Sequence, residues 1–195
     1  MAEVELPNLK ELEEIKEKKF TRGVALVTAV FAVVLAIASL GGGRTMKEML
    51  LAQQQASDQW AFYQAKSIRE HLYKSQKFML ENELNLLSQT LNTESAEKVK
   101  ASIEALAGEE SKFAKDKKEI EQEARKLEKE RDEYRSRDPY FEYAEVLLQI
   151  AIVMASVSII SASRAVFGFS VLVASLGALM CANGYLQIFE LPFMH

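Results

Sequence analysis

The sequence predicts an all-α membrane protein with three transmembrane helices and a long antiparallel helical hairpin, a coiled coil, inserted between the first and the second. Three observations predict this fold class. Three apolar runs are long enough to cross a bilayer. Residues 44–138, between the first two runs, contain no proline and one glycine, Gly108. Apolar residues in that segment recur at alternating steps of three and four, which is typical of coiled coils.

Charge is distributed unevenly along the chain and excludes several classes of protein. Residues 144–195 contain three charged groups, whereas residues 44–143 contain 18 basic and 20 acidic ones. The net charge of −4 argues against a nucleic-acid binder that works by bulk charge, so we expect no nucleic-acid partner. Cys181 is the single cysteine, which excludes an intrachain disulfide and a cysteine-rich zinc site.

Residues 1–22 are predicted to form an N-terminal amphipathic segment, helical from Pro7 to Phe20. A helix lying on the membrane surface and a simple extension of the following span are both compatible with this pattern. Residues 23–43 are the first predicted transmembrane helix, because 18 residues from Gly23 to Leu40 lack any charge. A secretory signal is the alternative, but the apolar stretch is too long and no A-x-A cleavage site follows.

Residues 44–138 are predicted to form the extramembrane coiled-coil hairpin, with its turn near 92–93. Asn92-Thr93, followed by acidic residues, is typical of a helix start. Arms of 45–91 and 94–137 would then be about 70 and 66 Å long and both reach the membrane. A turn at Gly108 would leave the second arm too short.

The expected hairpin seam follows two heptad patterns. In the first arm the pattern contains Ala61, Ala65, Ile68, Leu72, Ser75, Met79, Asn82 and Leu86, broadened by Leu80, Leu84, Leu87 and Leu91. In the second arm it contains Val99, Ile103, Leu106, Glu110, Phe113, Lys117, Ile120, Ala124, Leu127, Arg131 and Tyr134. We expect these two sets to pack against each other.

Residues 139–163 and 165–189 are the second and third predicted transmembrane helices, followed by a tail, 190–195. Asp138-Pro139 is expected to start the second of them, since proline suits the first helical position. Arg164 is the one charge between the two spans, which predicts a tight turn at a membrane surface. Small residues are expected to let helices pack closely in lipid, namely Ala174, Gly177, Ala178, Cys181 and Ala182.

Basic residues predict the orientation in the membrane. Residues 1–22 contain five, and Arg164 falls on the same side by parity, whereas residues 190–195 contain none. The positive-inside rule therefore favours a cytoplasmic N-terminus and a periplasmic hairpin in a bacterial inner membrane. Basic residues between 125 and 137 weigh in the opposite direction.

Chemistry-bearing patterns are scarce. His71 and His195 are far apart in the sequence, and no nucleophile-elbow, phosphate-loop or zinc-protease motif occurs. The apolar cores of the spans hold no ionisable group, which argues against a single-chain transporter. We therefore expect no catalytic activity, cofactor or metal.

A polar stripe surrounds the only tryptophan and is the candidate oligomer interface: Gln53, Ser57, Trp60, Tyr63, Gln64 and Ser67. A wide packing face inside the hairpin is the alternative. The function that this arrangement favours is a homo-oligomeric structural or scaffolding assembly in the membrane, in contact with lipid and with copies of itself. An oligomeric pore, or a sensor that couples a signal to another protein, remain alternatives.

The stretch from Ala56 to Ile68, ASDQWAFYQAKSI, resembles the signature of a bacterial membrane-protein family known as domain of unknown function 4337. The resemblance extends over most of the chain and implies one span, a charged helical segment and two closing spans. It also implies a basic turn between the last two spans, where Arg164 stands here. It implies no activity, cofactor or catalytic residue.

Overall fold

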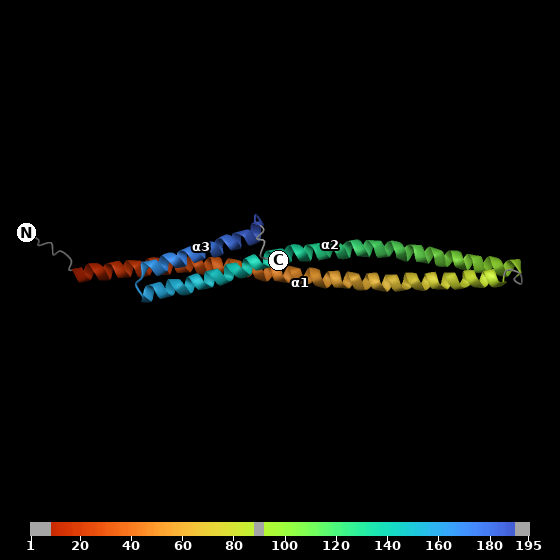
Figure 1. Cartoon of the computed structure of the whole chain (residues 1–195), viewed down its shortest axis with the longest axis horizontal. Coiled ribbons are helices and arrows are strands. Elements are labelled where there is room, and N and C mark those ends of the chain that lie inside the picture. The colour runs from red at the N-terminus through yellow and green to blue at the C-terminus, as the bar shows by residue number, and fades with distance from the viewer. Residues whose placement is uncertain (1–8, 88–91, 190–195) are drawn as a thin grey trace, which may run out of the picture. The chain divides into compact units, whose positions relative to one another are not determined.

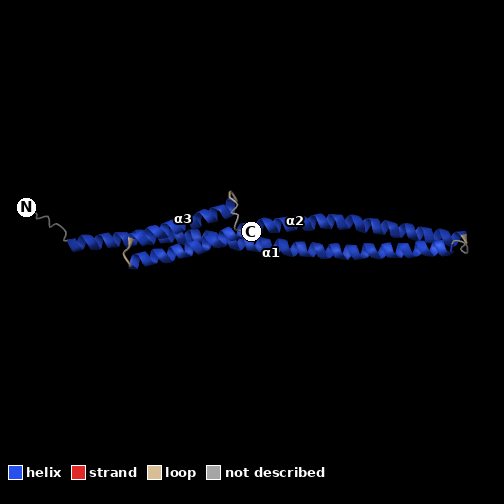
Figure 2. Ribbon diagram, viewed as in Figure 1, coloured by secondary structure: helices blue, strands red, loops and turns tan. Residues whose placement is uncertain are grey.

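The computed structural model describes residues 9–87 and 92–189, with side chains from Glu14 onward. These residues are helical apart from short turns and include no strand (Figure 2). The helices are α1 (Leu9–Leu87), α2 (Thr93–Ile160) and α3 (Arg164–Leu186) (Figure 1). Each is long and apolar enough to cross a membrane, which confirms the all-α class and the three apolar helices.

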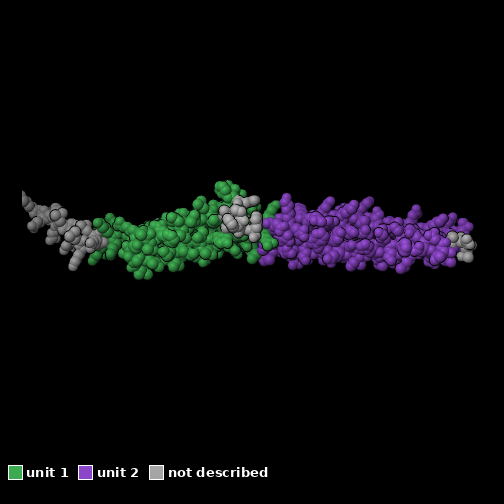
Figure 3. All heavy atoms as spheres, viewed as in Figure 1, with its two compact units in different colours: residues 1–48, 133–195 green, residues 49–132 purple. Residues whose placement is uncertain are grey.

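Some expected segments lie outside the described residues. They are the first eight residues of the N-terminal segment, the residues 88–91 before the expected turn, and the tail 190–195. The described chain divides into two compact units, drawn in green and purple in Figure 3. Unit 1 comprises residues 1–48 and 133–195, and unit 2 comprises residues 49–132.

Helix α1 is continuous over 79 residues. Residues 9–22 extend the first apolar span without a break, so of the two alternatives for this segment the structure has the helical extension. The three consecutive glycines at 41–43 leave the helix uninterrupted, since none of them adopts a positive φ.

Helix α2 begins at Thr93, where Asn92 acts as the N-cap. The backbone N–H of Ser95 donates to Asn92 Oδ1 at 2.9 Å, and Ala96 N donates to the Asn92 carbonyl at 3.1 Å. The first of these bonds satisfies one of the amide groups that a helix start leaves unpaired, and the second is the first intrahelical hydrogen bond of α2. The helix continues through Gly108, so the chain does not turn there.

The expectation that a helix starts at Asp138-Pro139 is wrong, because α2 passes through both residues. Proline has no N–H and so removes one hydrogen bond from the helix, but its fixed φ is helical. A helix that is already formed on both sides can therefore continue through Pro139 at the loss of that bond. The preference of proline for the first helical position is a statistical tendency, and it does not exclude proline from the interior of a helix.

Helix α3 follows a short turn in which Ala162 has a φ of 46°. The helix ends at Leu186, three residues before the expected boundary at 189. Gln187 adopts a left-handed conformation, and the side chain of Asn183 accepts hydrogen bonds from the backbone N–H groups of Ile188 and Phe189 at 3.1 and 3.0 Å. This local capping ends the helix inside the apolar run.

Unit 1 packs α3 and the C-terminal part of α2 against the N-terminal part of α1 (Figure 1). Its central side chain is Phe141 of α2, which is 2% exposed. Besides the aromatic Phe31, the core consists mainly of small and aliphatic residues: Val24, Ala38, Ala144, Leu148, Ala151, Ala155, Val173, Ala174 and Cys181. Small residues on several helices allow the close approach that stabilises helix packing in lipid.

Unit 2 consists of a first arm, residues 49–87 of α1, and a second arm, residues 93–132 of α2. Residue numbers rise along the first arm as they fall along the second in the contacts between them. Gln53 contacts Arg131, Trp60 contacts Glu128, and Lys77 contacts Glu110. The arms are therefore antiparallel. The residues of the first arm that are at least half-buried at heptad steps are Ala52, Ala56, Gln59, Tyr63, Lys66, Glu70, Tyr73, Lys77, Leu80 and Leu84.

Candidate functional site

Ion pairs hold the two arms of unit 2 together along their seam. Lys66 Nζ lies 2.6 Å from Asp116 Oδ2, Lys77 Nζ lies 2.5 Å from Glu110 Oε2, and Lys117 Nζ lies 2.6 Å from Glu70 Oε2. All six side chains are between about one fifth and one third exposed. Pairs at this depth give geometric specificity to the seam more than large net stability.

The pKa values of four groups in these pairs, Lys77, Glu110, Asp116 and Lys117, move in the direction that favours the charged form. The hydrogen bond from Lys77 lowers the pKa of Glu110, and the hydrogen bond from Lys66 lowers the pKa of Asp116. The hydrogen bond to Glu70 raises the pKa of Lys117, and the bond to Glu110 raises the pKa of Lys77. For these four groups, the hydrogen bonds between the arms therefore stabilise the charged form.

The polar positions that interrupt the second-arm heptad each have a partner in the first arm. Glu110 pairs with Lys77, Lys117 pairs with Glu70, and Arg131 donates to Gln53 Oε1 at 2.9 Å. All eight apolar or aromatic residues of the expected seam of this arm are buried or half-buried in the structure: Val99, Ile103, Leu106, Phe113, Ile120, Ala124, Leu127 and Tyr134.

The first-arm seam lies elsewhere from where the sequence pattern places it. Ile68 is 69% exposed, Leu72 54% and Met79 65%, and Leu87 is also exposed, whereas Leu84 is half-buried. The expectation that Ile68, Leu72, Met79 and Leu87 pack against the second arm of the same chain is therefore wrong. The physical reason is that the arms match through charge pairs and stacked aromatic rings, so the stripe with Tyr63, Lys66, Glu70 and Tyr73 turns inward.

Aromatic rings occupy the middle of this seam. Tyr73 stacks on Phe113 with ring centroids 5.4 Å apart and planes inclined by 15°. Lys66 Nζ lies 5.0 Å from the Phe113 ring centre, a cation–π distance. Phe113 is therefore covered by a tyrosine and a lysine from the first arm.

Three of the six candidate interface residues make contacts inside the chain. Trp60 Nε1 donates to Glu128 Oε1 at 2.9 Å, and Tyr63 packs edge-on against Trp60. Gln53 accepts from Arg131, as described above. Ser67 is half-buried, while Ser57 and Gln64 are exposed, so the structure divides the set between the seam and its margin.

The expected transmembrane packing residues on α3 also divide. Ala174, Gly177 and Cys181 are buried, Ala178 is half-buried and Ala182 is exposed. At Gly177 an added Cβ would lie 3.2 Å from the carbonyl oxygen of Ala144. Gly177 therefore lets α3 approach the α2 backbone closely.

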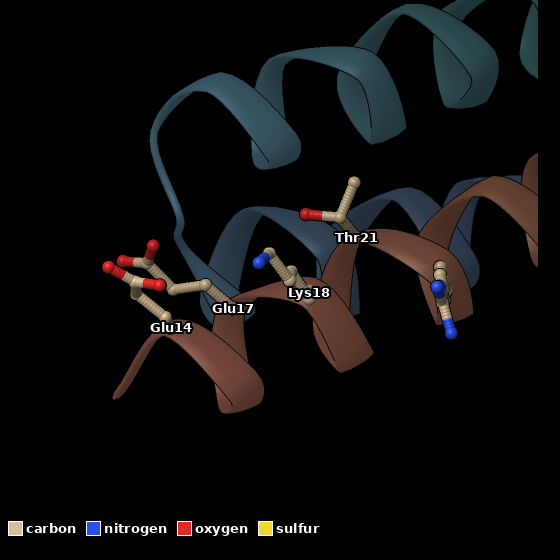
Figure 4. Close-up of a pocket in the computed structure, with 5 residues that line it drawn as sticks. Glu14, Glu17, Lys18 and Thr21 are labelled. Carbon is tan, nitrogen blue, oxygen red and sulfur yellow. The ribbon is translucent and has the colours of Figure 1, made fainter. Parts of the chain in front are cut away.

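Two hollows lie at the N-terminal end of α1 in unit 1. The first is a surface groove whose lining comes from α1 alone, with Glu14, Glu17, Lys18 and Thr21 along one side of the helix (Figure 4). The second is lined by α1 and α3 and combines Lys19 and Arg164 with an apolar wall of Phe20, Gly23, Val24, Val27 and Phe167. The second hollow thus brings two basic residues from separate helices to one place.

The described residues contain no group of three or more His, Cys, Asp or Glu side chains arranged to hold a metal ion. His71, the one histidine that the structure describes, is exposed on the first arm.

Comparison with known proteins is consistent with the signature around Trp60. A family model for a domain of unknown function, DUF4337, matches residues 20–187. The chain belongs to this family. The match confirms the resemblance that the sequence suggests and covers both units of this DUF4337 chain. No curated protein and no solved structure matches it.

Several features of this DUF4337 chain could not be found from sequence spacing. The ion-pair partners Lys77 and Asp116, and Glu128, which accepts a hydrogen bond from Trp60, resemble ordinary surface charges until the arms are paired. The position of Phe141 between two helices had an indirect signal, since Gly41 and Gly184 each leave room for its ring. These two glycines, which lie inside predicted helices, are the sequence feature that indicates the close approach of α1 and α3 to Phe141.

Proposed function

We propose that this chain is a non-enzymatic protein of the bacterial inner membrane that forms a homo-oligomeric structural scaffold. Residues 23–43, 139–163 and 165–189 are its spans in this proposal. Residues 44–138 form an antiparallel coiled-coil hairpin outside the membrane, with its turn near 92–93. Partners are membrane lipid and further copies of the chain.

One observation carries the membrane part of the proposal, namely the apolar surface of unit 1. Large aliphatic side chains on all three helices are exposed, among them Leu26, Val33, Val153, Leu172 and Leu179. Soluble proteins rarely leave continuous apolar patches open to water, whereas lipid-facing helices require them. Unit 2, in contrast, contains the ion pairs and most charged side chains.

Sidedness receives support from the hollow between α1 and α3. Lys19 precedes the first span and Arg164 lies between the last two, and both line this hollow. Because Lys19 and Arg164 line the same hollow, the N-terminal segment and the α2–α3 turn are placed on one side of the membrane in this proposal. With the basic residues of 1–22, the positive-inside rule makes that side the cytoplasm.

The scaffold part follows from the construction of unit 2. Each arm buries one stripe against the other, and two helices alone bury little apolar surface. An extended pair of this kind supplies surface for association. A structural role in an assembly is the function that uses such a surface.

The mass of the detergent-solubilised protein tests this proposal. After correction for bound detergent, light scattering should give a multiple of 22.0 kDa. A mass equal to one chain over a hundredfold range of concentration would contradict the assembly. Ion conductance by the purified protein in planar bilayers would instead favour the pore.

A further inference from the structure

The outward face of the first arm bears a second heptad stripe that the fold leaves open. We call it the outer stripe: Ala61, Ala65, Ile68, Leu72, Ser75, Met79, Asn82 and Leu86. All eight residues are exposed. Phe62 and Phe78, both more than half exposed, widen it on its two sides.

On the first arm, many large apolar side chains face away from the second arm, which is the reverse of what an isolated pair of helices in water would adopt. The seam between the arms contains three ion pairs, while large apolar side chains point outward from the first arm. The second arm differs, since its exposed face is strongly charged, with Lys100, Glu104, Lys115, Lys118, Glu119, Lys126, Lys129 and Glu130. One face of unit 2 is thus built for water and the opposite face for contact.

The outer stripe has the spacing that pairs two helices of the same sequence. Its residues alternate steps of four and three from Ala61 to Leu86, which are the a and d positions of a coiled coil. In a parallel, in-register pair each position meets its own copy, so Ile68 packs on Ile68 and Leu72 on Leu72. The stripe extends over 26 residues, or about 38 Å of helix.

The flanking positions fit the same pairing. In a parallel pair each g position faces the e position of the next heptad on the partner helix. The facing residues would be Gln64 with Arg69, His71 with Gln76, and Phe78 with Glu83. No facing pair consists of two acids or of two lysine or arginine side chains. Asp58 occupies the core position that precedes Ala61 in the heptad. In a parallel pair it would lie against the Asp58 carboxylate of the second copy, so the stripe begins after it.

We infer that the outer stripe is the contact between copies of this chain, packed parallel and in register against the same stripe of a second copy. The inference rests on the proposed function, since two chains anchored in one membrane with the same orientation present their arms in parallel. Each copy would add six or more large apolar side chains, and stable interfaces take about 800 Å² from each partner.

Disulfide crosslinking in native membranes tests this contact. In a Cys181→Ser background, Ile68→Cys and Met79→Cys should each form disulfide-linked dimers on mild oxidation, because each cysteine would face its own copy. Lys118→Cys, on the charged outward face of the second arm, is the matched control. We expect at least about fivefold more dimer at positions 68 and 79 than at 118, which reflects the close Cβ approach that a disulfide requires.

A second pair of variants separates this inference from the scaffold proposal. Ile68→Lys with Leu72→Lys should reduce the solubilised protein to one chain without loss of helicity, because both positions are exposed within the chain. An oligomeric double variant, together with absent crosslinks at 68 and 79, would overturn the outer-stripe contact and leave the scaffold intact. A monomeric wild type would overturn both. Dimers that form only when the 68 and 79 variants are mixed would show antiparallel pairing and overturn the inference as well.

Discussion

The Phe141 ring of α2 lies against Gly41 of α1 and Gly184 of α3 in unit 1. A Cβ added at Gly41 of α1 would lie 2.5 Å from Phe141 Cε1, and one added at Gly184 of α3 would lie 2.9 Å from Phe141 Cζ. Real Cβ atoms do not approach a ring this closely, so both positions require glycine for packing. Gly43, two residues along α1, has no atom within 4 Å of an added Cβ.

These two glycines provide a matched pair of substitutions. Gly41→Ala should lower the free energy of unfolding by about 1–3 kcal/mol, because the buried Phe141 ring must shift. Gly43→Ala should leave it unchanged or raise it by up to about 1 kcal/mol, since alanine is the better helix former. Thermal unfolding in detergent, followed by circular dichroism, measures both. Equal effects of the two substitutions would show that Phe141 does not limit helix approach.

The Lys77–Glu110 pair predicts a dependence of stability on pH. The pKa of Glu110 is lowered in the folded chain by the hydrogen bond from Lys77, so the stabilisation is complete above the unfolded pKa and is lost as pH falls through the folded value. Unit 2 should therefore lose stability below about pH 4. Glu110→Gln should weaken the protein at pH 7 and reduce the further loss on acidification.

Glu109→Gln is the control for this pH experiment. Glu109 is more exposed than Glu110, and its ion-pair partner Lys112, 3.8 Å away, is on the same helix. This pair therefore does not link the two arms. Thermal melts at pH 7 and pH 3 should show little difference between Glu109→Gln and the wild type. A Glu110→Gln protein that retains the full acid sensitivity would mean that this pair does not stabilise the seam.

At the scale of elements, the start of α2 depends on one side chain. Asn92→Ala removes the acceptor of the Ser95 N–H bond and should cost about 1 kcal/mol of stability in the first turn. Asn92→Asp keeps an acceptor and a favourable charge at the positive end of the helix, so it should be close to wild type. Amide hydrogen exchange of residues 94–97 measures the difference. Equal protection in both variants would contradict a capping role.

The two arms show how far a heptad pattern can predict packing. In the second arm the pattern identified the inward face, because a single apolar stripe runs along it and its polar interruptions have charged or polar partners on the first arm. The first arm has two stripes two residues apart: one is more apolar and the other bears Lys66, Glu70 and Lys77. Hydrophobicity alone selects the first stripe. The second packs inward because its charges complement Glu110, Asp116 and Lys117, a relation that exists only once the arms are paired.

The candidate interface around Trp60 was also predictable only in part, because its partners on the second arm become apparent only once the arms are paired. A polar stripe with the only tryptophan is visible in the sequence, but its contact with Glu128, 68 residues away, is not. The helix boundaries show a similar limit. Asn92 is a strong local signal and was found, whereas the end of α3 depends on Asn183 folding its side chain onto later amides.

At the scale of the whole molecule, the chain separates surfaces by environment. The exposed residues of unit 1 are largely aliphatic, and those of the second arm in unit 2 are largely charged. In the proposed membrane protein, this difference in exposed side chains would place unit 1 in lipid and unit 2 in water. The side of the membrane that unit 2 occupies is a separate question, which depends on basic residues near the spans.

The basic residues predict that unit 2 faces the periplasm. Residues 1–22 contain five lysines and arginines and residues 190–195 contain none, and an excess of basic residues stays in the cytoplasm. In a Cys181→Ser background, Lys100→Cys should react in intact cells with a thiol reagent that does not cross the inner membrane. Lys16→Cys should react only after lysis, and the two positions control each other because both side chains are exposed. Labelling of Lys16→Cys in intact cells, with protection of Lys100→Cys, would reverse the orientation. It would also show that the basic residues 125–137 outweigh those of the N-terminal segment.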